Sequence, residues 1–290
     1  IALRDPKGMR PLCMGHLGKS PVFASESCAL DSIGASFDRD VRPGELIVVD
    51  ESGERVMESG INPDASKCAL CVFEHIYFAR PDSVIDGQSV YQARLEAGRI
   101  LARSHPVQAD LVIGVPDSGL AAAIGFAQES GIPYGEGLVK NRYIGRTFIQ
   151  PTQNGRESAV SIKLSALRRS VEGKRVVMID DSIVRGTTMR QIVDLLKKAG
   201  ATEVHVRISA PEFLWPCYYG TDIDDRSQLA SVKFTHEELT ERIGADSLGF
   251  LPLAQVKEIA KDSKLNFCTA CFSGDYPYLV PTHADKTAFE

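Results

Sequence analysis

Long apolar segments are absent from this sequence. The longest apolar runs, such as LIVVD (46–50) and VVMID (176–180), are far shorter than the roughly 20 residues that a membrane-spanning helix needs. Long basic runs are absent too, and the formal net charge of the 290-residue chain is −5. Nucleic acid as the main partner is therefore disfavoured, because nucleic-acid-binding domains concentrate basic residues.

Cysteines are few, and their number is odd. The seven positions are Cys13, Cys28, Cys68, Cys71, Cys217, Cys268 and Cys271. An odd count in a long chain argues against a disulfide framework, which is typical of short secreted proteins. A reducing compartment fits better, so we expect a cytoplasmic protein in which closely spaced cysteines indicate metal binding.

The composition, with 43% hydrophobic and 24% charged residues, is that of a globular protein with one large domain or two ordinary ones. The chain begins at Ile1 inside a strand-like segment, and we expect it to be a fragment or processed product. We predict a β-rich segment at 1–60, a linker at 61–72 and an α/β domain at 73–290. The β-rich segment offers no catalytic constellation by itself.

The α/β domain alternates strands and helices. ADLVIGVPDSG (109–119) reads as a buried strand and a turn, followed by a helix that Gly131 ends. KRVVMIDD (174–181) is a second such strand; its helix places five apolar residues on one face and is predicted to be capped by Thr187 or Thr188 and ended by Gly200. EVHVRISAP (203–211) is a third strand. This order predicts a doubly wound parallel sheet with ligands beyond the carboxyl ends of its strands.

Two adjacent carboxylates, Asp180 and Asp181, end the second strand. The helix that follows their turn presents free N–H groups that suit a phosphate, and Ser182, Thr187 and Thr188 add hydroxyl groups. Carboxylates would repel that phosphate, so their natural partners are sugar hydroxyls, Mg²⁺ or a cationic transition state. A ribose 5-phosphate fits this description. The alternative is a strand that ends in two solvated acids; a P-loop motif is absent.

The polar segment 139–159 lacks a sustained period. It is rich in glycine, arginine, asparagine and glutamine, and a connection of this length is usually an active-site lid or a disordered insertion. We favour a lid, because the segment lies between the two acidic turns. A plain solvated insertion is the alternative.

VVMIDDSIVRGTT (176–188) closely resembles the phosphoribosyl-diphosphate (PRPP) motif of type I phosphoribosyltransferases. Other stretches narrow the resemblance to the glutamine phosphoribosylpyrophosphate amidotransferase family, which catalyses the first committed step of purine synthesis. They are FEHIYFARPDS (73–83), VKNRYIGRTFI (139–149), CYYGTDI (217–223) and CFSGDYP (271–277). RDPKGMRPL (4–12) and FASESCALDSIG (23–34) resemble the end of that family's glutaminase domain. Residues 1–60 would then be the C-terminal remnant of an N-terminal-nucleophile hydrolase domain.

The resemblance implies roles for individual residues. It places the PRPP loop on Asp180, Asp181, Ser182, Ile183, Val184, Arg185, Gly186, Thr187 and Thr188, and the pyrophosphate loop on Asp117, Ser118 and Gly119. Mg²⁺ would be held by Ser118, Asp180 and Asp181, with substrate oxygens completing its shell. Lys140 and Tyr143 match a loop that closes over PRPP and join the two aspartates as expected catalytic residues; Arg142 and Arg146 add charge to this lid. Ammonia would attack the anomeric carbon as pyrophosphate leaves.

The cysteines allow two readings. By spacing alone, the pairs Cys68–Cys71 and Cys268–Cys271 suggest a four-cysteine zinc site, although the gap between them is unusually wide. The resemblance implies instead a [4Fe–4S] cluster on Cys71, Cys217, Cys268 and Cys271, with a structural role. Ordinary buried thiols are the alternative, and this is the better interpretation for Cys13 and Cys28.

The family's glutaminase half uses an N-terminal cysteine nucleophile, which this sequence does not contain, so we expect at most the ammonia-dependent reaction from this chain. The family further implies a homotetramer and inhibition by purine nucleotides. A PRPP-sensing regulator and a salvage or orotate phosphoribosyltransferase are the competing functions. The glutaminase-like tail and the cysteines count against salvage enzymes.

Overall fold

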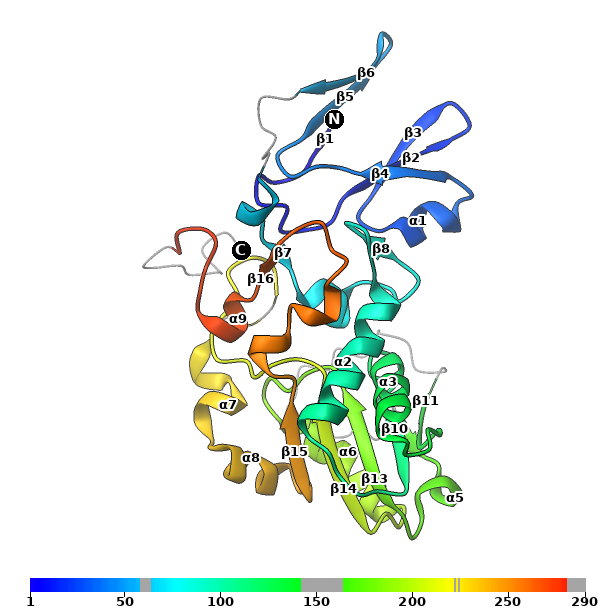
Figure 1. Cartoon of the computed structure of the whole chain (residues 1–290), viewed down its shortest axis with the longest axis vertical. Coiled ribbons are helices and arrows are strands. Elements are labelled where there is room, and N and C mark those ends of the chain that lie inside the picture. The colour runs from blue at the N-terminus through cyan, green and yellow to red at the C-terminus, as the bar shows by residue number, and fades with distance from the viewer. Residues whose placement is uncertain (58–63, 142–163, 222, 224, 281–290) are drawn as a thin grey trace. The chain divides into compact units, whose positions relative to one another are not determined.

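The computed structural model describes residues 1–57, 64–141, 164–221, 223 and 225–280 (Figure 1). The chain divides into two compact units. Unit 1 comprises Ile1–Ala93, Pro216–Asp224 and Lys257–Glu290, and unit 2 comprises Arg94–Trp215 and Asp225–Val256. The domain boundaries predicted at residues 60 and 72 remain a prediction. No helix among the described residues is long and apolar enough to cross a membrane.

The N-terminal part of unit 1 is built from two small antiparallel sheets. One has the order β3-β2-β4 and the other β1-β5-β6. Their strands are β1 (Ala2–Leu3), β2 (Cys13–Leu17), β3 (Ser20–Ala24), β4 (Ser36–Asp40), β5 (Leu46–Asp50) and β6 (Gly53–Met57), with helix α1 at Ser27–Ser32. Cys13 packs with Leu30 and Ala35 in one core, and Cys28 is also buried, as predicted.

The remainder of unit 1 is made of short elements from distant parts of the chain. In sequence order they are η2 (Ala65–Lys67), β7 (Leu70–Cys71), η3 (Glu74–Phe78), β8 (Val84–Ile85), β9 (Gln88–Ser89), η6 (Glu258–Ala260), β16 (Phe267–Cys268) and α9 (Ala270–Ser273). β7 pairs in parallel with β16, so that Cys71 lies opposite Cys268. This two-residue pairing joins segments almost 200 positions apart in the sequence.

Unit 2 contains the predicted parallel sheet. Its order is β10-β13-β14-β15, and all three pairings are parallel. The strands are β10 (Leu111–Gly114), β13 (Arg175–Asp180), β14 (Glu203–Ile208) and β15 (Ser247–Phe250). Almost every side chain of β10, β13 and β14 is buried, and in β10 and β13 this burial accounts for the continuous apolar runs of the sequence. A smaller antiparallel pair joins β11 (Leu138–Lys140) to β12 (Leu164–Ala166).

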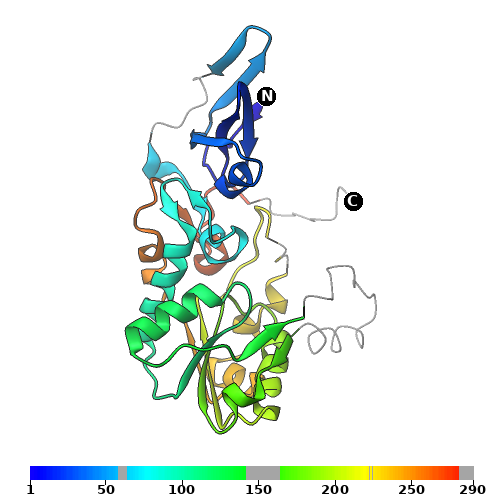
Figure 2. The ribbon, with the colours of Figure 1, turned by 90° about the vertical axis from the view of Figure 1, so that its right-hand side faces the viewer.

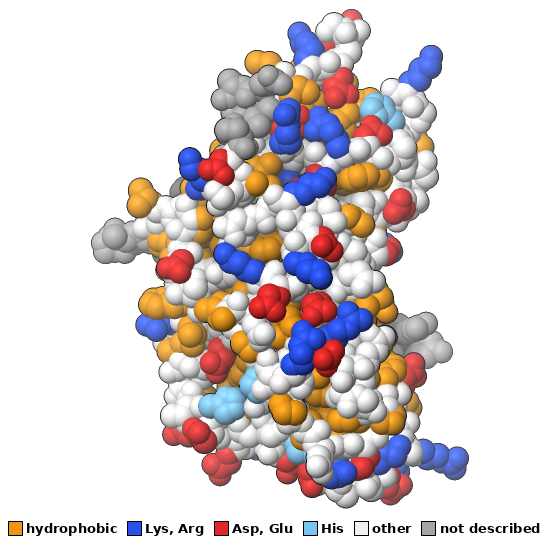
Figure 3. All heavy atoms as spheres, viewed as in Figure 1, with side chains coloured by type: hydrophobic (Ala, Val, Ile, Leu, Met, Phe, Trp, Pro, Cys, Tyr) orange, Lys and Arg blue, Asp and Glu red, His pale blue; other side chains and the backbone are white. Residues whose placement is uncertain are grey.

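Helices cover both faces of this sheet (Figures 1 and 2). The helices of this part of the chain are α2 (Val90–Ser104, which begins in unit 1), α3 (Leu120–Ser130), α5 (Arg168–Val171), α6 (Thr187–Lys198), α7 (Ala230–Lys233) and α8 (His236–Ile243), with short turns η4 (Arg226–Gln228) and η5 (Leu253–Gln255). Of these, α3, α6 and α8 contact strands of the sheet. The predicted face of α6 is buried at Met189, Ile192, Val193, Leu196 and Ala199. On the surface that Figure 3 shows, acidic and basic side chains alternate and form no continuous basic patch.

The start of α6 differs from the prediction. Its N-cap is Gly186, in the left-handed conformation at φ 81°, and no side chain caps the helix. The prediction that Thr187 or Thr188 would cap it is therefore wrong. Because both threonines lie inside the first turn of the helix, their hydroxyl groups and the first N–H groups remain available to a ligand.

Candidate active site

The two acidic turns follow the neighbouring strands β10 and β13, at the point where the strand order of the sheet reverses. β10 forms an isolated parallel bridge with Tyr134 on one side, through Val112, and pairs with β13 on the other. After β10 the chain thus adds Tyr134 on one side of this strand, and it later adds β13 on the other side. In doubly wound sheets, ligands bind in the crevice at this topological switch point. The turn 115–119 follows β10, and the turn 181–186 follows β13.

Side chains of these two turns are in direct contact. The Ser118 hydroxyl donates to Oδ2 of Asp181 at 2.5 Å, and the Ser182 hydroxyl donates to Oδ1 of the same carboxylate. The backbone N–H of Asp181 donates to Oδ1 of Asp180 at 2.9 Å. The structure therefore brings Ser118 to the consecutive residues Asp180, Asp181 and Ser182, which lie more than 60 positions later in the sequence.

A backbone contact fixes the spacing between the turns. The N–H of Val115 donates to the carbonyl of Ile179, at 2.8 Å. A Cβ atom on Gly119 would lie only 2.4 Å from the same carbonyl oxygen, so any side chain at this position would force the two turns apart. Gly119 belongs to the predicted pyrophosphate loop, and its role in the structure is to permit this close approach.

Both carboxylates are largely removed from water, with exposures of 9% for Asp180 and 8% for Asp181. Burial, and then the charge of Asp181, raises the pKa of Asp180 well above its usual value. Burial also raises the pKa of Asp181, while hydrogen bonds from Ser118 and Ser182 and the charge of Arg94 oppose that rise. The pair therefore resists full ionisation until a cation or a hydrogen-bond donor compensates it.

Arg94 is a member of this site that the sequence analysis missed. It lies on α2, is only 5% exposed, and its charge favours the ionised form of Asp181. A buried arginine within an apolar helical face was the available signal, because arginine is almost never fully buried without a partner. Nothing in the sequence, however, connects it to an aspartate 87 positions later.

The rest of the predicted PRPP loop leads from the acids to α6. Ile183 is buried, and the N–H of Ala230 donates to the Val184 carbonyl, so this part of the turn is anchored. Arg185, Thr187 and Thr188 are exposed around Gly186. Free N–H groups and the positive end of the dipole of a 12-residue helix thus lie beside hydroxyl groups, which is the chemistry that holds a phosphate.

Lys140 reaches the first acidic turn from β11. Its Nζ lies 2.6 Å from Oδ2 of Asp117, and both side chains are more than half exposed. A hollow of about 510 Å³ is lined by these two residues together with Gly114, Pro116, Leu120, Tyr134, Gly135, Glu136, Leu138, Val139 and Asn141. The predicted lid residues Arg142, Tyr143 and Arg146 lie outside the described residues.

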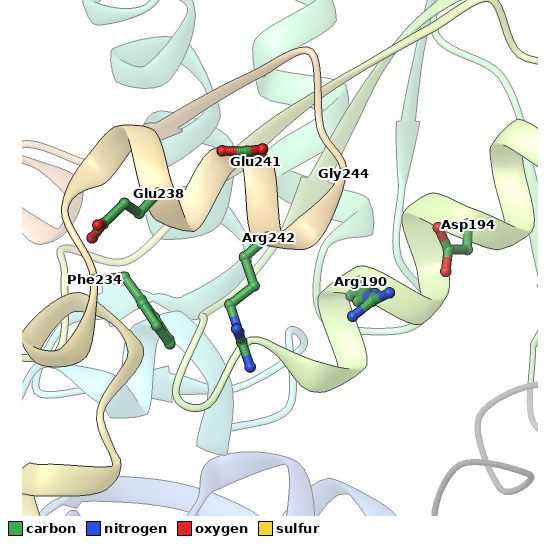
Figure 4. Close-up of a pocket in the computed structure, with 7 residues that line it drawn as sticks. All are labelled: Arg190, Asp194, Phe234, Glu238, Glu241, Arg242 and Gly244. Carbon is green, nitrogen blue, oxygen red and sulfur yellow. The ribbon is translucent and has the colours of Figure 1, made fainter.

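A second hollow, of about 530 Å³, contains none of the predicted site residues. It lies between α6 and α8 and is lined by Arg190, Asp194, Phe234, Glu238, Glu241, Arg242 and Gly244 (Figure 4). The guanidinium carbon of Arg242 lies 4.6 Å from the centre of the Phe234 ring. The lining charges have both signs, and nothing in the structure indicates a ligand for this groove.

The acid pair suits Mg²⁺ in its chemistry. Hard carboxylate and hydroxyl oxygens are the ligands that this ion takes, and the raised pKa values mean that a cation would relieve the buried charge. The predicted Mg²⁺ ligands Ser118, Asp180 and Asp181 are grouped here, and Ser182 also contacts Asp181. Among the described residues no group of three or more acidic, histidine or cysteine side chains is arranged to hold a metal ion, so substrate oxygens would have to complete the shell.

The four predicted cluster cysteines all line one cavity inside unit 1. Cys71 and Cys268 lie opposite each other on β7 and β16, Cys271 lies on α9, and Cys217 comes from the segment 216–224. Cys68 is buried outside this lining, so the four-cysteine zinc set suggested by spacing is not the set that shares a cavity. Spacing alone is a poor guide here because Cys71 lies on β7 and lines the cavity, whereas the Cys68 thiol, before the strand, donates to the carbonyl of Asp64.

The lining of the cavity fits a soft, thiolate-ligated group, because it provides four thiols. Burial raises the pKa of Cys71 to about 12 and also raises that of Cys268 and Cys271, so these thiols stay protonated without a metal. The cavity volume is about 20 Å³, enough for roughly one water molecule. A cluster would have to spread the four cysteines apart, in line with the finding that no metal-binding group is formed among the described residues.

Comparison with known proteins gives a consistent result. Residues 90–212 match the family "phosphoribosyl transferase domain". The chain is 50% identical over 283 residues to an amidophosphoribosyltransferase of Archaeoglobus fulgidus, covering 97% of this chain and 61% of the relative. It is also 50% identical over 281 residues to the amidophosphoribosyltransferase of Bacillus subtilis, covering 96% of this chain and 58% of the relative. The chain thus spans about three fifths of the length of these relatives.

A comparison with solved structures points to the same proteins. Glutamine phosphoribosylpyrophosphate (PRPP) amidotransferase from B. subtilis, in complex with ADP and GMP, superimposes with a TM-score of 0.84 at 51% identity. The match covers 94% of this chain and 60% of that one. The fold of the parallel-sheet unit is therefore that of the type I phosphoribosyltransferases, as predicted.

Proposed function

We propose that this chain, which is about 50% identical to amidophosphoribosyltransferases over almost all of its own length, forms 5-phosphoribosylamine from PRPP and ammonia, the first step of purine biosynthesis. The observation that carries the proposal is the contact of Ser118 with Asp181, immediately before the N-terminus of α6. This contact joins a loop suited to pyrophosphate and a loop suited to ribose 5-phosphate across the switch point of the sheet.

The turn at Gly186 would bind the 5-phosphate of PRPP through the first N–H groups of α6 and the hydroxyl groups of Thr187 and Thr188. Asp180 and Asp181 would then face the ribose, whose hydroxyl groups can donate to them. Their negative charge would also stabilise the cation-like carbon that develops as pyrophosphate leaves. No covalent protein nucleophile is required, since the reaction depends on positioning and on charge.

The turn 117–119 would hold the pyrophosphate. Ser118 contributes its hydroxyl group, and Gly119 allows the backbone to approach closely. Lys140 is ion-paired with Asp117 in the structure, and its amino group would exchange this carboxylate for the departing phosphates. Tyr143 and the rest of 142–159 would complete the enclosure as a lid, which would exclude water from the reacting carbon.

Mg²⁺ would be bound by Ser118, Asp180 and Asp181 together with PRPP oxygens, and would supply positive charge to the leaving pyrophosphate. A [4Fe–4S] cluster on Cys71, Cys217, Cys268 and Cys271 would have a structural role, pinning α9 and β16 to β7. The convergence of these four thiols on one cavity supports it. Purine nucleotides are proposed inhibitors, since the B. subtilis relative binds ADP and GMP. A homotetramer in the cytoplasm remains a proposal from the family resemblance.

The test is to incubate the chain with PRPP, Mg²⁺ and ammonium at pH 8 and to follow pyrophosphate. We expect release that depends on ammonia and stops when Mg²⁺ is chelated. Release with a purine base or orotate instead of ammonia would support a salvage or orotate enzyme, and PRPP binding without turnover would support the regulator. Either outcome would overturn the amidotransferase proposal for this chain.

A further inference from the structure

One charged side chain lies against the cysteine cavity, and it comes from the β-rich N-terminal part of unit 1. Arg10 is the single cationic residue among the described residues that line this cavity. It precedes β2 by only a few residues, far from every cysteine of the cavity in the sequence. Its position there is therefore a product of the fold and not of a local motif.

Three contacts hold the guanidinium of Arg10 in place. Its Nη1 lies 2.5 Å from Oε1 of Glu74, a carboxylate that is only 6% exposed. Its Nη2 donates to the carbonyl of Tyr219 at 3.4 Å, two residues after Cys217. Its Cζ lies 4.9 Å from the centre of the Phe78 ring. A planar guanidinium can make all of these contacts at once, whereas a lysine could not.

The backbone at Gly220 passes close to the guanidinium of Arg10. Gly220 has φ +114°, which L side chains rarely adopt, and a Cβ atom there would lie 2.7 Å from Nη2 of Arg10. The backbone after Cys217 therefore approaches the guanidinium as closely as a residue without a side chain allows. This approach brings the positive charge next to the segment that carries one of the four thiols.

We propose that Arg10 is a positioning residue for the cluster, holding it by setting a permanent positive charge against the negative charge of four thiolates. This rests on the proposed cluster. Four thiolates outweigh the charge of the cluster core, so the cluster would bring net negative charge into a buried space. Arg10 is always protonated; Glu74 contacts one end of its guanidinium, and the other end donates to the carbonyl of Tyr219, which also lines the cavity.

The charge assignment predicts opposite effects for two partners of one ion pair. Removing the charge of Arg10 should weaken cluster retention. Removing the charge of Glu74 should strengthen it, because Arg10 would then be neutralised by the cluster alone. If the pair merely stabilised the fold, Arg10→Gln and Glu74→Gln would act in the same direction.

Arg39 offers a matched control within the same unit. Its side chain is 38% exposed against 37% for Arg10, and it forms an ion pair with the buried carboxylate of Glu45 at 2.8 Å. It does not line the cysteine cavity. Arg39→Gln therefore also removes a half-exposed arginine that pairs with a buried glutamate, but at a position away from the proposed cluster.

The experiment uses the whole chain, reconstituted under argon with iron and sulfide at pH 8. Iron and sulfide per chain are measured first, and then the rate at which iron passes to an added chelator. We expect about four iron atoms per wild-type chain. Release should be about tenfold faster for Arg10→Gln, a typical effect of removing an outer-shell partner. It should be nearly unchanged for Arg39→Gln, intermediate for Arg10→Lys and slower than wild type for Glu74→Gln.

The two proposals fail in different ways. If the wild-type chain retains neither iron nor sulfide, the cluster proposal falls, and the role of Arg10 falls with it. If the wild-type chain is loaded but Arg10→Gln releases iron at the rate of Arg39→Gln, only the role of Arg10 is overturned. The same holds if Glu74→Gln and Arg10→Gln both release iron faster. Should Arg10→Gln fail to fold, Glu74→Gln and Arg10→Lys still decide the sign.

Discussion

The acidic turns of unit 2 and the cysteine cavity of unit 1 both contain buried groups whose ionisation is unfavourable. They differ in how far the charged form is stabilised before a ligand binds. Asp181 already accepts two hydroxyl hydrogen bonds and has Arg94 nearby. The thiols of the cavity are close to one another but do not form a metal-binding group among the described residues. A site that binds a substrate in every catalytic cycle must be formed in advance, whereas a site filled once can be shaped by its occupant.

The largest expected effect is on the preorganised side of this comparison. Asp181→Asn should lower ammonia-dependent pyrophosphate release about 10²- to 10³-fold, because it removes charge stabilisation at the reacting carbon. Initial rates at saturating PRPP, Mg²⁺ and ammonium measure this. Asp194→Asn, on α6 but outside the acidic turns, is the control and should retain the wild-type rate. Equal rates for the two variants would show that the acidic turn is not the reacting site.

The cysteine cavity should respond to the loss of one thiol but not of its neighbour. Cys71→Ser should abolish retention of iron and sulfide, because a cluster of this kind requires four thiolates. Cys68→Ser removes a thiol outside the cavity lining and should retain both. Iron and sulfide analysis after anaerobic reconstitution measures the difference. Loss of iron in Cys68→Ser with retention in Cys71→Ser would reverse our assignment of the ligands.

The backbone contact between the turns can be tested by adding a single carbon atom. Gly119→Ala places Cβ against the Ile179 carbonyl and should lower the free energy of unfolding by about 2–3 kcal/mol. Gly131→Ala is a suitable control, since its Cβ would meet nothing within 4 Å and it carries only the strain of φ +74°, about 1–2 kcal/mol. Urea unfolding measures both. A smaller loss at Gly119 than at Gly131 would show that the turns can move apart freely.

The smallest effect is a gain. The folded state raises the pKa of Asp180 above the unfolded value near 3.9. Below the unfolded pKa the carboxyl is protonated in both states and costs the fold nothing. As pH rises through the folded pKa, the buried carboxyl ionises and the folded state pays the full penalty of the buried charge. Asp180→Asn removes this penalty and should raise the free energy of unfolding by about 1–2 kcal/mol at pH 8 without Mg²⁺. The gain should vanish near pH 3. A gain that does not depend on pH would mean that ionisation of Asp180 is not its cause.

The parallel sheet was predictable because its strands are buried on both sides, so VVMID reads as a continuous apolar run with a carboxylate at its end. The paired acids and the helix after them were also predictable, because strand, turn and helix follow one another directly in the sequence. α2 was not predicted, although Ser89 directly precedes it and Gln92 follows three residues later, which is a capping-box pattern. In the structure the N–H of Gln92 donates to the Ser89 hydroxyl, and Arg94 was missed together with this helix. The cap of α6 was wrong because Gly186 itself takes the left-handed conformation, which frees both threonines.

Contacts between distant segments were beyond the reach of the sequence. Nothing in the residues near Arg10 indicates that it lies beside the segment after Cys217, because that proximity depends on its contact with the Tyr219 carbonyl and on the close approach at Gly220. The family resemblance did name the four cysteines that share the cavity, where spacing alone favoured a set including Cys68. Resemblance carries three-dimensional information that local patterns do not contain.

The approach of Gly119 to the Ile179 carbonyl also bears on how such a chain can diverge. The separation between the two turns is set by main-chain atoms, so side chains elsewhere in either turn can be replaced without altering that separation. The surroundings of the site can therefore diverge while the backbones of the two turns stay in register, provided that position 119 itself keeps no side chain.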